Sequence, residues 1–242
     1  MKGFLFLLVC CILNNKEEVP HGAQKLIKAY PEKISHYKDN KIFFKDGSSL
    51  VYDDGKSKNT KELLENPDIE DQFKWKYETP GTNDAGRIRN EAFFKKIYGN
   101  SKEEVAKKLI EITWCPKLVN QKIKVTTVNG IDKKIQKIGA ELEQYPELKA
   151  YITNIGGTFN WRKIAGTNRL SMHSFGMTMD INTKFSNYWQ WDCKCTNEEN
   201  KLKYKNRIPK KIIAIFEKHG FIWGGNWFHY DTMHFEYRPE FF

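Results

Sequence analysis

Residues 176–182, Gly-Met-Thr-Met-Asp-Ile-Asn, alternate between polar and apolar side chains, and this pattern constrains the fold more than any other part of the chain. It predicts a β-strand with one face in the core and one face turned away from it. The apolar face consists of Met177, Met179 and Ile181, and the polar face of Thr178, Asp180 and Asn182. Asp180 therefore points away from the core that the methionines fill.

A second stretch near the C-terminus, residues 233–237 (Met-His-Phe-Glu-Tyr), alternates in the same way. The alternation places His234 and Glu236 on one face and the three apolar side chains on the other. If the two strands are neighbours, His234 and Asp180 converge with His173, which lies in the loop just ahead of the first strand. Imidazole and carboxylate donors suit Zn²⁺, and three protein ligands leave a fourth position for water.

Asp231 precedes His234 by three residues. A carboxylate at this spacing is close enough to take a proton at the metal centre without itself binding the ion. An isolated D-x-x-H spacing more often marks a turn or a capping Asp. Considered together with His173 and Asp180, Asp231 predicts a catalytic zinc centre rather than a structural metal site.

The composition indicates a folded protein with a basic surface. The chain has 242 residues, 40% of them hydrophobic and 14% aromatic, which is enough for one large domain or a domain with an extension. Lys and Arg number 40 against 30 Asp and Glu, so the formal net charge is +10. This charge favours anionic partners such as nucleic acid, acidic lipid or an anionic wall polymer, and it does not choose among them.

Apolar periodicity predicts three helices, and shorter apolar runs predict strands between them. The helices cover residues 102–111, where Ser101 and Glu104 form a capping box, residues 131–142, and the segment from Pro209 to Gly220. The strands cover residues 124–128, 152–159, 176–182, 221–223 and 233–237. This order predicts an α+β fold with a small mixed or antiparallel sheet flanked by helices and with the zinc site on the sheet.

Residues 1–19 are predicted to be an export signal. Lys2 precedes an apolar run at residues 4–13, and polar sequence follows. The run is shorter than the ~20 residues of a membrane-spanning helix. Cys10 and Cys11 follow Leu-Leu-Val, which resembles a relaxed bacterial lipoprotein signal. The alternatives are an uncleaved hydrophobic N-terminus and a wrongly chosen start codon.

Residues 20–80 are predicted to form an N-terminal extension. Two apolar runs, residues 41–44 and 49–52, flank Asp46-Gly47, which predicts a β-hairpin. The remaining residues, 81–242, are assigned to the zinc-binding domain.

Three cysteines follow the N-terminal segment. In an exported protein two of them are expected to form a disulfide, and we expect Cys115 to pair with Cys193 or Cys195. The two cysteines of Cys-Lys-Cys sit too close in sequence to bridge each other easily. A Cys-x-Cys zinc site is the alternative, although it has no matching Cys or His pair nearby.

The two alternating stretches resemble one known family. Residues 171–182 match S-x-H-x-x-G-x-A-x-D-I, a signature of the zinc D-alanyl-D-alanine carboxypeptidase and L-alanyl-D-glutamate endopeptidase family of peptidoglycan metallopeptidases, with Thr178 where Ala is usual. Residues 231–236, Asp-Thr-Met-His-Phe-Glu, are similar to the D-x-x-H-F-E closing motif of that family. The resemblance spans roughly residues 84–238. Asp231, where other members have Glu, is typical of the branch that contains phage and bacterial endopeptidases.

The resemblance implies a role for each matching residue. His173, Asp180 and His234 correspond to the zinc ligands, and Asp231 corresponds to the general base. The family also uses an Arg ahead of the first His to hold a substrate carboxylate or the developing oxyanion. Arg162 fits that place best and Arg169 is the second candidate, since an Arg side chain forms a bidentate fork for carboxylates. The chain has Asn-Trp-Arg-Lys where the family usually has G-Y-R-S, and a structural ion pair is the alternative role for Arg162.

Three further residues are predicted to support the site. Glu236 is expected to hold a ligand His. Ser171 is expected either to orient the site through its hydroxyl or to cap the loop. Trp227, like Trp189, Trp191 and Trp223, either lines a cleft or packs in the core, and packing is the expectation for most of them. His229 is expected to lie near the site or at the surface without binding the metal.

The predicted function is therefore that of an exported, zinc-dependent peptidase that acts on the peptidoglycan stem peptide. The cut is of the D,D-carboxypeptidase or the L-alanyl-D-glutamate endopeptidase type. The alternative is a catalytically inactive wall-binding protein of the same fold. We expect no nucleic-acid partner, since no binding motif accompanies the charge. Membrane attachment is expected only through a lipid anchor, and the location is the bacterial cell envelope, in the periplasm or at the cell surface.

Overall fold

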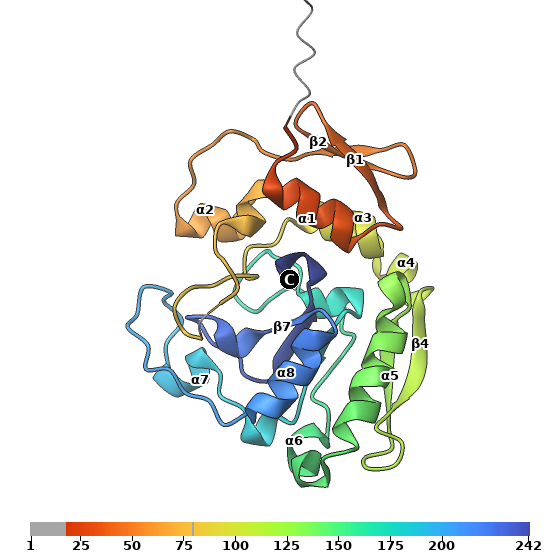
Figure 1. Cartoon of the computed structure of the whole chain (residues 1–242). Helices are drawn as coiled ribbons and strands as arrows, with labels where there is room; N and C mark the ends of the chain where they lie inside the picture. The colour runs from red at the N-terminus through yellow and green to blue at the C-terminus, as the bar shows by residue number, and fades with distance from the viewer. Residues whose placement is uncertain (1–17, 79) are drawn as a thin grey trace, which may run out of the picture.

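The computed structural model describes residues 18–78 and 80–242 and confirms the predicted α+β class. Where the sequence predicts one small sheet, the described residues form three small antiparallel sheets. Its N-terminal helix and sheet lie together at one end of the molecule, above the elements of the C-terminal half (Figure 1). The predicted export signal and the lipidation candidates Cys10 and Cys11 lie outside the described residues. Among the described residues, no helix is long and apolar enough to cross a membrane.

The N-terminal extension consists of helix α1 (His21–Ala29) and a three-stranded sheet in the order β1-β2-β3. The strands are β1 (Ile34–Lys38), β2 (Lys41–Phe44) and β3 (Ser49–Val51). The hairpin expected around Asp46 and Gly47 is confirmed, because β2 pairs antiparallel with β3. Strand β1, on the other edge of β2, was not predicted.

The predicted helix over residues 102–111 is wrong in its second half. Helix α4 (Lys102–Ala106) ends after five residues, and residues 109–114 form strand β4 (Leu109–Trp114), paired along its full length with β5 (Gln121–Thr126). The Ser101 hydroxyl does cap the helix by accepting a hydrogen bond from the Glu104 backbone at 3.3 Å. Three of the four residues in the following run, Ile-Glu-Ile-Thr, are β-branched and favour a strand. Pairing of this strand with β5 outweighs the helical periodicity.

The two longer amphipathic helices are confirmed as α5 (Ile131–Leu142) and α8 (Lys210–Lys218). Four further helices complete the described chain: α2 (Thr60–Glu65), α3 (Glu91–Tyr98), α6 (Lys149–Ile152) and α7 (Trp189–Cys193). The strand expected over residues 152–159 is wrong, because α6 occupies its first position and a loop follows. Part of this loop still runs beside the metal-site strand, where the Asp180 backbone N–H donates to the Gly157 carbonyl at 2.8 Å.

The C-terminal sheet has the order β6-β8-β7 and carries both motif strands. Strand β6 (Thr178–Asp180) pairs antiparallel with β8 (His234–Tyr237), which pairs antiparallel with β7 (Phe221–Trp223). The motif strands are shorter than predicted, but their alternation is confirmed: Met179 lies opposite Phe235, and both are fully buried.

One hydrophobic core continues from the N-terminal extension into the C-terminal half. The Tyr30 ring at the end of α1 meets Phe93 of α3 edge-to-face, with 5.6 Å between ring centroids. Its hydroxyl donates a hydrogen bond of 2.8 Å to the buried Glu240 carboxylate, which also accepts from Arg238. The C-terminus accordingly lies beneath α1 (Figure 1). The division of the chain after residue 80 stays a prediction.

The expected disulfide is wrong. Cys193 bonds to Cys195, and Cys115 is a buried free thiol. Lys194 between them adopts the left-handed conformation, with φ 53°, and this brings the two Cα atoms to 5.2 Å. That separation is within the usual range for a disulfide, so the close sequence spacing is no obstacle here.

The Tyr30–Glu240 hydrogen bond generates a stability prediction. Tyr30→Phe keeps the ring packed on Phe93 but removes the donor to a buried carboxylate, so we expect unfolding to become easier by about 1–2 kcal/mol. Urea denaturation followed by circular dichroism measures the change. Tyr145→Phe, at a half-buried ring under Lys211, is the control and is expected to change stability less. Equal stability of Tyr30→Phe and the unmodified protein would contradict this account.

Candidate metal centre

The structure brings together the three residues that the sequence predicts as metal ligands. The two strand residues are direct cross-strand partners, because Asp180 pairs with His234 in the β6–β8 register. Asp180 Oδ1 lies 3.0 Å from His234 Nδ1, and Asp180 Oδ2 lies 3.1 Å from His173 Nε2. One donor atom of each residue lies within 4.8 Å of the others, so the three can surround a single cation.

The position of His173 depends on a short 3₁₀ helix, η4 (Met172–Phe175), that ends at Gly176. Gly176 has φ 65°, and a Cβ there would lie 2.6 Å from Leu109 Cδ2. Both facts require glycine, because a side chain would be strained and would collide with β4. The turn is further held by the Ser174 hydroxyl, which accepts from the Arg162 backbone N–H at 3.1 Å.

Glu236 holds His234 from the side opposite to Asp180, as predicted. Its Oε2 lies 3.2 Å from His234 Nε2, so Nδ1 is left to face Asp180 and His173. Arg89 donates to both carboxylate oxygens, at 2.6 and 3.2 Å, and Arg238 donates to Oε1 at 3.1 Å. Burial opposes the negative charge of Glu236, but these partners hold its pKa well below the usual range.

Asp231 lies in the loop before β8 and is fixed by its backbone. Its N–H donates to the Gly224 carbonyl at 2.9 Å, and a Cβ on Gly224 would lie 2.7 Å from the Asp231 carbonyl oxygen. Side-chain atom Oδ1 is buried and has no hydrogen-bond partner among the described residues. Burial, and next the Asp180 carboxylate, raise the pKa of Asp231 to about 7. This carboxyl can therefore exchange a proton near neutral pH.

The chemistry of the cluster fits a zinc ion. Burial opposes the charge on Asp180, but His173 and His234 hold the pKa of its carboxyl well below the usual range. Burial likewise works to lower the pKa of His234, but hydrogen bonds to Asp180 and Glu236 outweigh it and raise that pKa to about 10. The cluster thus stabilises a positive charge between two imidazoles and a carboxylate. Two imidazoles and one carboxylate are a ligand set that zinc takes in catalytic sites.

The two candidate arginines have different surroundings. The Arg162 side chain is exposed, and its Nη1 donates to the Lys163 carbonyl at 3.3 Å. Only the backbone of Arg162 contacts the loop of His173. Arg169 lines a cavity together with Arg87 and Arg89.

The other residues near the motifs are mostly buried. Ser171 is buried, and its backbone N–H donates to the Arg162 carbonyl, but the hydroxyl that ties the loop belongs to Ser174. Trp227 packs with its ring centroid 5.6 Å from that of His234. Three of the four tryptophans are buried as expected, while Trp191 is 59% exposed. His229 is buried and bound to Asp84 at 2.7 Å, apart from the metal cluster.

Sequence reasoning missed Arg89 and Arg238, which fix the partner of a predicted metal ligand. Arg89 lies 147 residues before Glu236, so no spacing in the sequence connects the two. Arg238 lies just past the end of β8, two residues after Glu236, and could have been found by extending the period that places His234 and Glu236 on one face.

Comparison with known proteins agrees with the two motifs. Residues 165–237 match the family model described as D-alanyl-D-alanine carboxypeptidase, and this segment contains all three candidate ligands and Asp231. The family resemblance inferred from the sequence is thereby confirmed. Arg162 precedes the matched segment. No curated protein and no solved structure matches the chain.

Zinc binding is expected to release a proton. Because the metal-free protein keeps His234 protonated up to a pKa of about 10, the ion must displace that proton at neutral pH. Apparent zinc affinity should therefore rise about tenfold per pH unit for each proton released. Competition with a coloured chelator at pH 6, 7 and 8 measures this slope. His219→Ala, which alters a histidine paired with Glu141, should keep the slope, and an affinity independent of pH would refute the assignment.

Proposed function

We propose that the chain is a zinc-dependent peptidase that hydrolyses a peptide bond in the stem peptide of peptidoglycan, of the D,D-carboxypeptidase or the L-alanyl-D-glutamate endopeptidase type. The observation that carries the proposal is the environment of the Asp231 carboxyl. Its Oδ1 is buried without a hydrogen-bond partner among the described residues, and the nearby charges of Asp180 and His234 act on its pKa in opposite directions. The family match supports a peptidase. A purely structural metal site needs only its ligands and does not require a proton-accepting carboxyl beside them.

The proposed ligands are His173, Asp180 and His234. A zinc ion held there would supply Lewis-acid chemistry, which makes water nucleophilic near neutral pH and polarises a peptide carbonyl. Glu236 contacts Nε2 of His234, so Nδ1 is the ring nitrogen that would be available to hold the ion.

Asp231 is the proposed general base. Its carboxylate would take the proton of the attacking water and return it to the leaving amine, which requires a pKa near the working pH. Desolvation brings the pKa into that range. Arg162 remains the proposed contact for the carboxylate at the scissile end of the substrate or for the oxyanion, because its backbone is tied to the loop that carries His173.

The proposed place of action is the bacterial envelope, in the periplasm or at the cell surface, because peptidoglycan is found there. The formal charge of +10 favours binding to the anionic wall. A lipid on Cys10 or Cys11 is the proposed means of any membrane attachment, and nucleic acid is not a proposed partner. A catalytically inactive wall-binding protein is the alternative, and the Asp231 environment disfavours it.

Asp231→Asn should keep zinc and lose turnover. The amide has nearly the same shape but cannot accept the proton, so we expect kcat to fall by about 10²- to 10⁴-fold. Mass spectrometry of products from purified muropeptides measures turnover and identifies the bond that is cut, and elemental analysis measures zinc. Asp46→Asn, at an exposed carboxylate paired with Lys96, is the matched control and should behave as the unmodified protein. Full activity of Asp231→Asn would contradict the proposed role of Asp231 as general base.

His173→Ala and His234→Ala should each lose both zinc and activity, since two remaining ligands hold the ion poorly. His229→Ala removes an equally buried histidine outside the cluster and should keep stoichiometric zinc. Zinc content after dialysis and release of new amines from peptidoglycan are the two readouts. An unmodified protein that holds zinc and binds peptidoglycan but releases no amines would favour the inactive alternative.

A further inference from the structure

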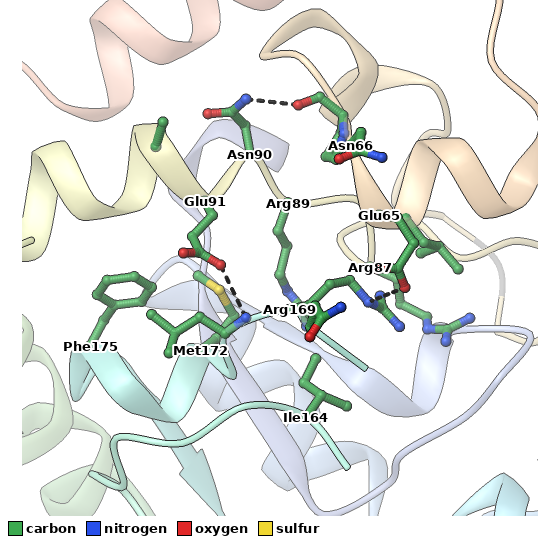
Figure 2. Close-up of a pocket in the computed structure, with 15 residues that line it drawn as sticks. Glu65, Asn66, Arg87, Arg89, Asn90, Glu91, Ile164, Arg169, Met172 and Phe175 are labelled. Atoms are coloured by element: carbon green, nitrogen blue, oxygen red, sulfur yellow. Dashed lines mark hydrogen bonds and ion pairs between the residues drawn. The ribbon is translucent and has the colours of Figure 1, made fainter. Parts of the chain in front are cut away.

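A cavity of about 430 Å³ lies between the N-terminal extension and the loop that leads to the metal centre. One wall comes from residues 64–67 at the end of α2, and the opposite wall comes from the segment of residues 164–175. Figure 2 shows the side chains of Arg87, Arg89 and Arg169 close together in this cavity. The volume is sufficient for a ligand of a few residues or of drug size.

Two of the three guanidinium groups already have strong acidic partners. Arg87 binds Glu198 through two nitrogens, at 2.7 and 3.0 Å, and Asp84 at 3.2 Å. Arg89 is occupied by both oxygens of Glu236. Their charges are compensated, so these two arginines are structural parts of the wall rather than free binding groups.

Arg169 differs from its neighbours. Its one ion pair is a long contact of 3.4 Å between Nε and Oε1 of Glu65, which lies at the end of α2 (Figure 2). The same Nε is buried and makes no hydrogen bond within residues 18–78 and 80–242. Burial, together with the positive charges of Arg87 and Arg89, lowers the pKa of Arg169. A buried donor without an acceptor is costly, and a bound carboxylate would remove that cost.

The polar groups of the lining leave Arg169 as the guanidinium that can take a ligand. Arg87 and Arg89 are paired with acids, and Glu91 is occupied by the Leu170 backbone N–H at 3.1 Å and by Lys95. A single guanidinium suits one carboxylate, to which it can donate two parallel hydrogen bonds. The remaining walls include Leu64, Ile164 and Phe175, which can pack on an aliphatic chain.

The cavity lies next to the candidate metal centre. Met172 lines it, and the next residue along the chain is His173. On the other side, Arg89 binds Glu236, which in turn holds His234. The cavity and the candidate metal centre are thus built on neighbouring residues of the same segments. The family model matches residues 165–237. Most of the cavity lining lies outside that segment, including residues 64–67, Arg87 and Arg89.

We propose that this cavity is a subsite for the carboxylate of an acidic residue in the peptide substrate, away from the bond that is cut. Arg169 binds that carboxylate, and Glu65 occupies Arg169 when the substrate is absent. The N-terminal extension thus has a specific role, because its helix α2 supplies one wall and the competing carboxylate. The identity of the ligand as a peptide rests on the proposed function.

The test is a binding measurement with two synthetic peptides. One is L-alanyl-γ-D-glutamyl-L-lysyl-D-alanyl-D-alanine, and the other is the same peptide with the glutamyl α-carboxylate amidated. Calorimetry on the zinc-loaded full chain carrying Asp231→Asn avoids consumption of either ligand. We expect the acid to bind at least tenfold more tightly than the amide. In the Arg169→Gln background the preference should disappear, with the affinity for the amide unchanged.

Glu65→Gln should change the affinity for the acid in the direction opposite to Arg169→Gln. Because it removes the competing carboxylate, the acid should bind at least threefold more tightly while the amide does not change. Arg207→Gln makes the same type of substitution at an exposed arginine outside the cavity and should alter neither affinity. Folding of each variant is checked by circular dichroism, and the Glu65→Gln result stands even if Arg169→Gln fails to fold.

The outcomes separate this proposal from the proposed function. Equal affinity for acid and amide, or no binding of either peptide, overturns the subsite. A preference that persists in Arg169→Gln also overturns it. If the preference is present but the unmodified, zinc-loaded protein cleaves neither peptide, the subsite stands and the hydrolytic function fails. Cleavage of both peptides without any preference leaves the function intact and removes the subsite.

Discussion

The buried carboxylate of Glu236 is the group on which the rest of the site depends. It is fully buried and accepts hydrogen bonds from Arg89 and Arg238 while it contacts the ring of His234. A buried carboxylate is stable only when its oxygens are paired with charge or with hydrogen bonds. Arg89, just ahead of α3, and Arg238, near the C-terminus, provide this pairing. The two arginines therefore hold their segments against β8 beside His234.

Two aspartates near this carboxylate in space have opposite electrostatics. Asp180 lies between two imidazoles, which keep it ionised, whereas Asp231 is desolvated and lies near the charge of Asp180, which raises its pKa to about 7. Environment therefore separates the two proposed roles, in which Asp180 holds a cation and Asp231 carries a proton. The glycine at position 224 makes this possible, because only a residue without a side chain lets the Asp231 backbone approach so closely.

The N-terminal extension belongs to the same folded unit as the metal site. Its Tyr30 packs on Phe93 and hydrogen-bonds Glu240, and the end of its α2 helix lines a cavity together with Met172, the residue before His173. The disulfide between Cys193 and Cys195 fixes a bend in the loop whose Glu198 pairs with an arginine of that cavity. Parts of the chain that carry no recognisable motif thus complete the surroundings of the site.

The sequence by itself determined the α+β class and pointed to the candidate metal ligands, because strand alternation is a local property and the two motif strands bury their apolar faces. Only the tertiary structure decided how the arginines are placed, since the Arg162 side chain is exposed while Arg89 reaches Glu236 from a distant segment. It also decided that residues 109–114 form a strand, because pairing with β5 outweighs local helical periodicity. Long-range pairing, burial and the compensation of buried charge depend on neighbours that no local pattern specifies.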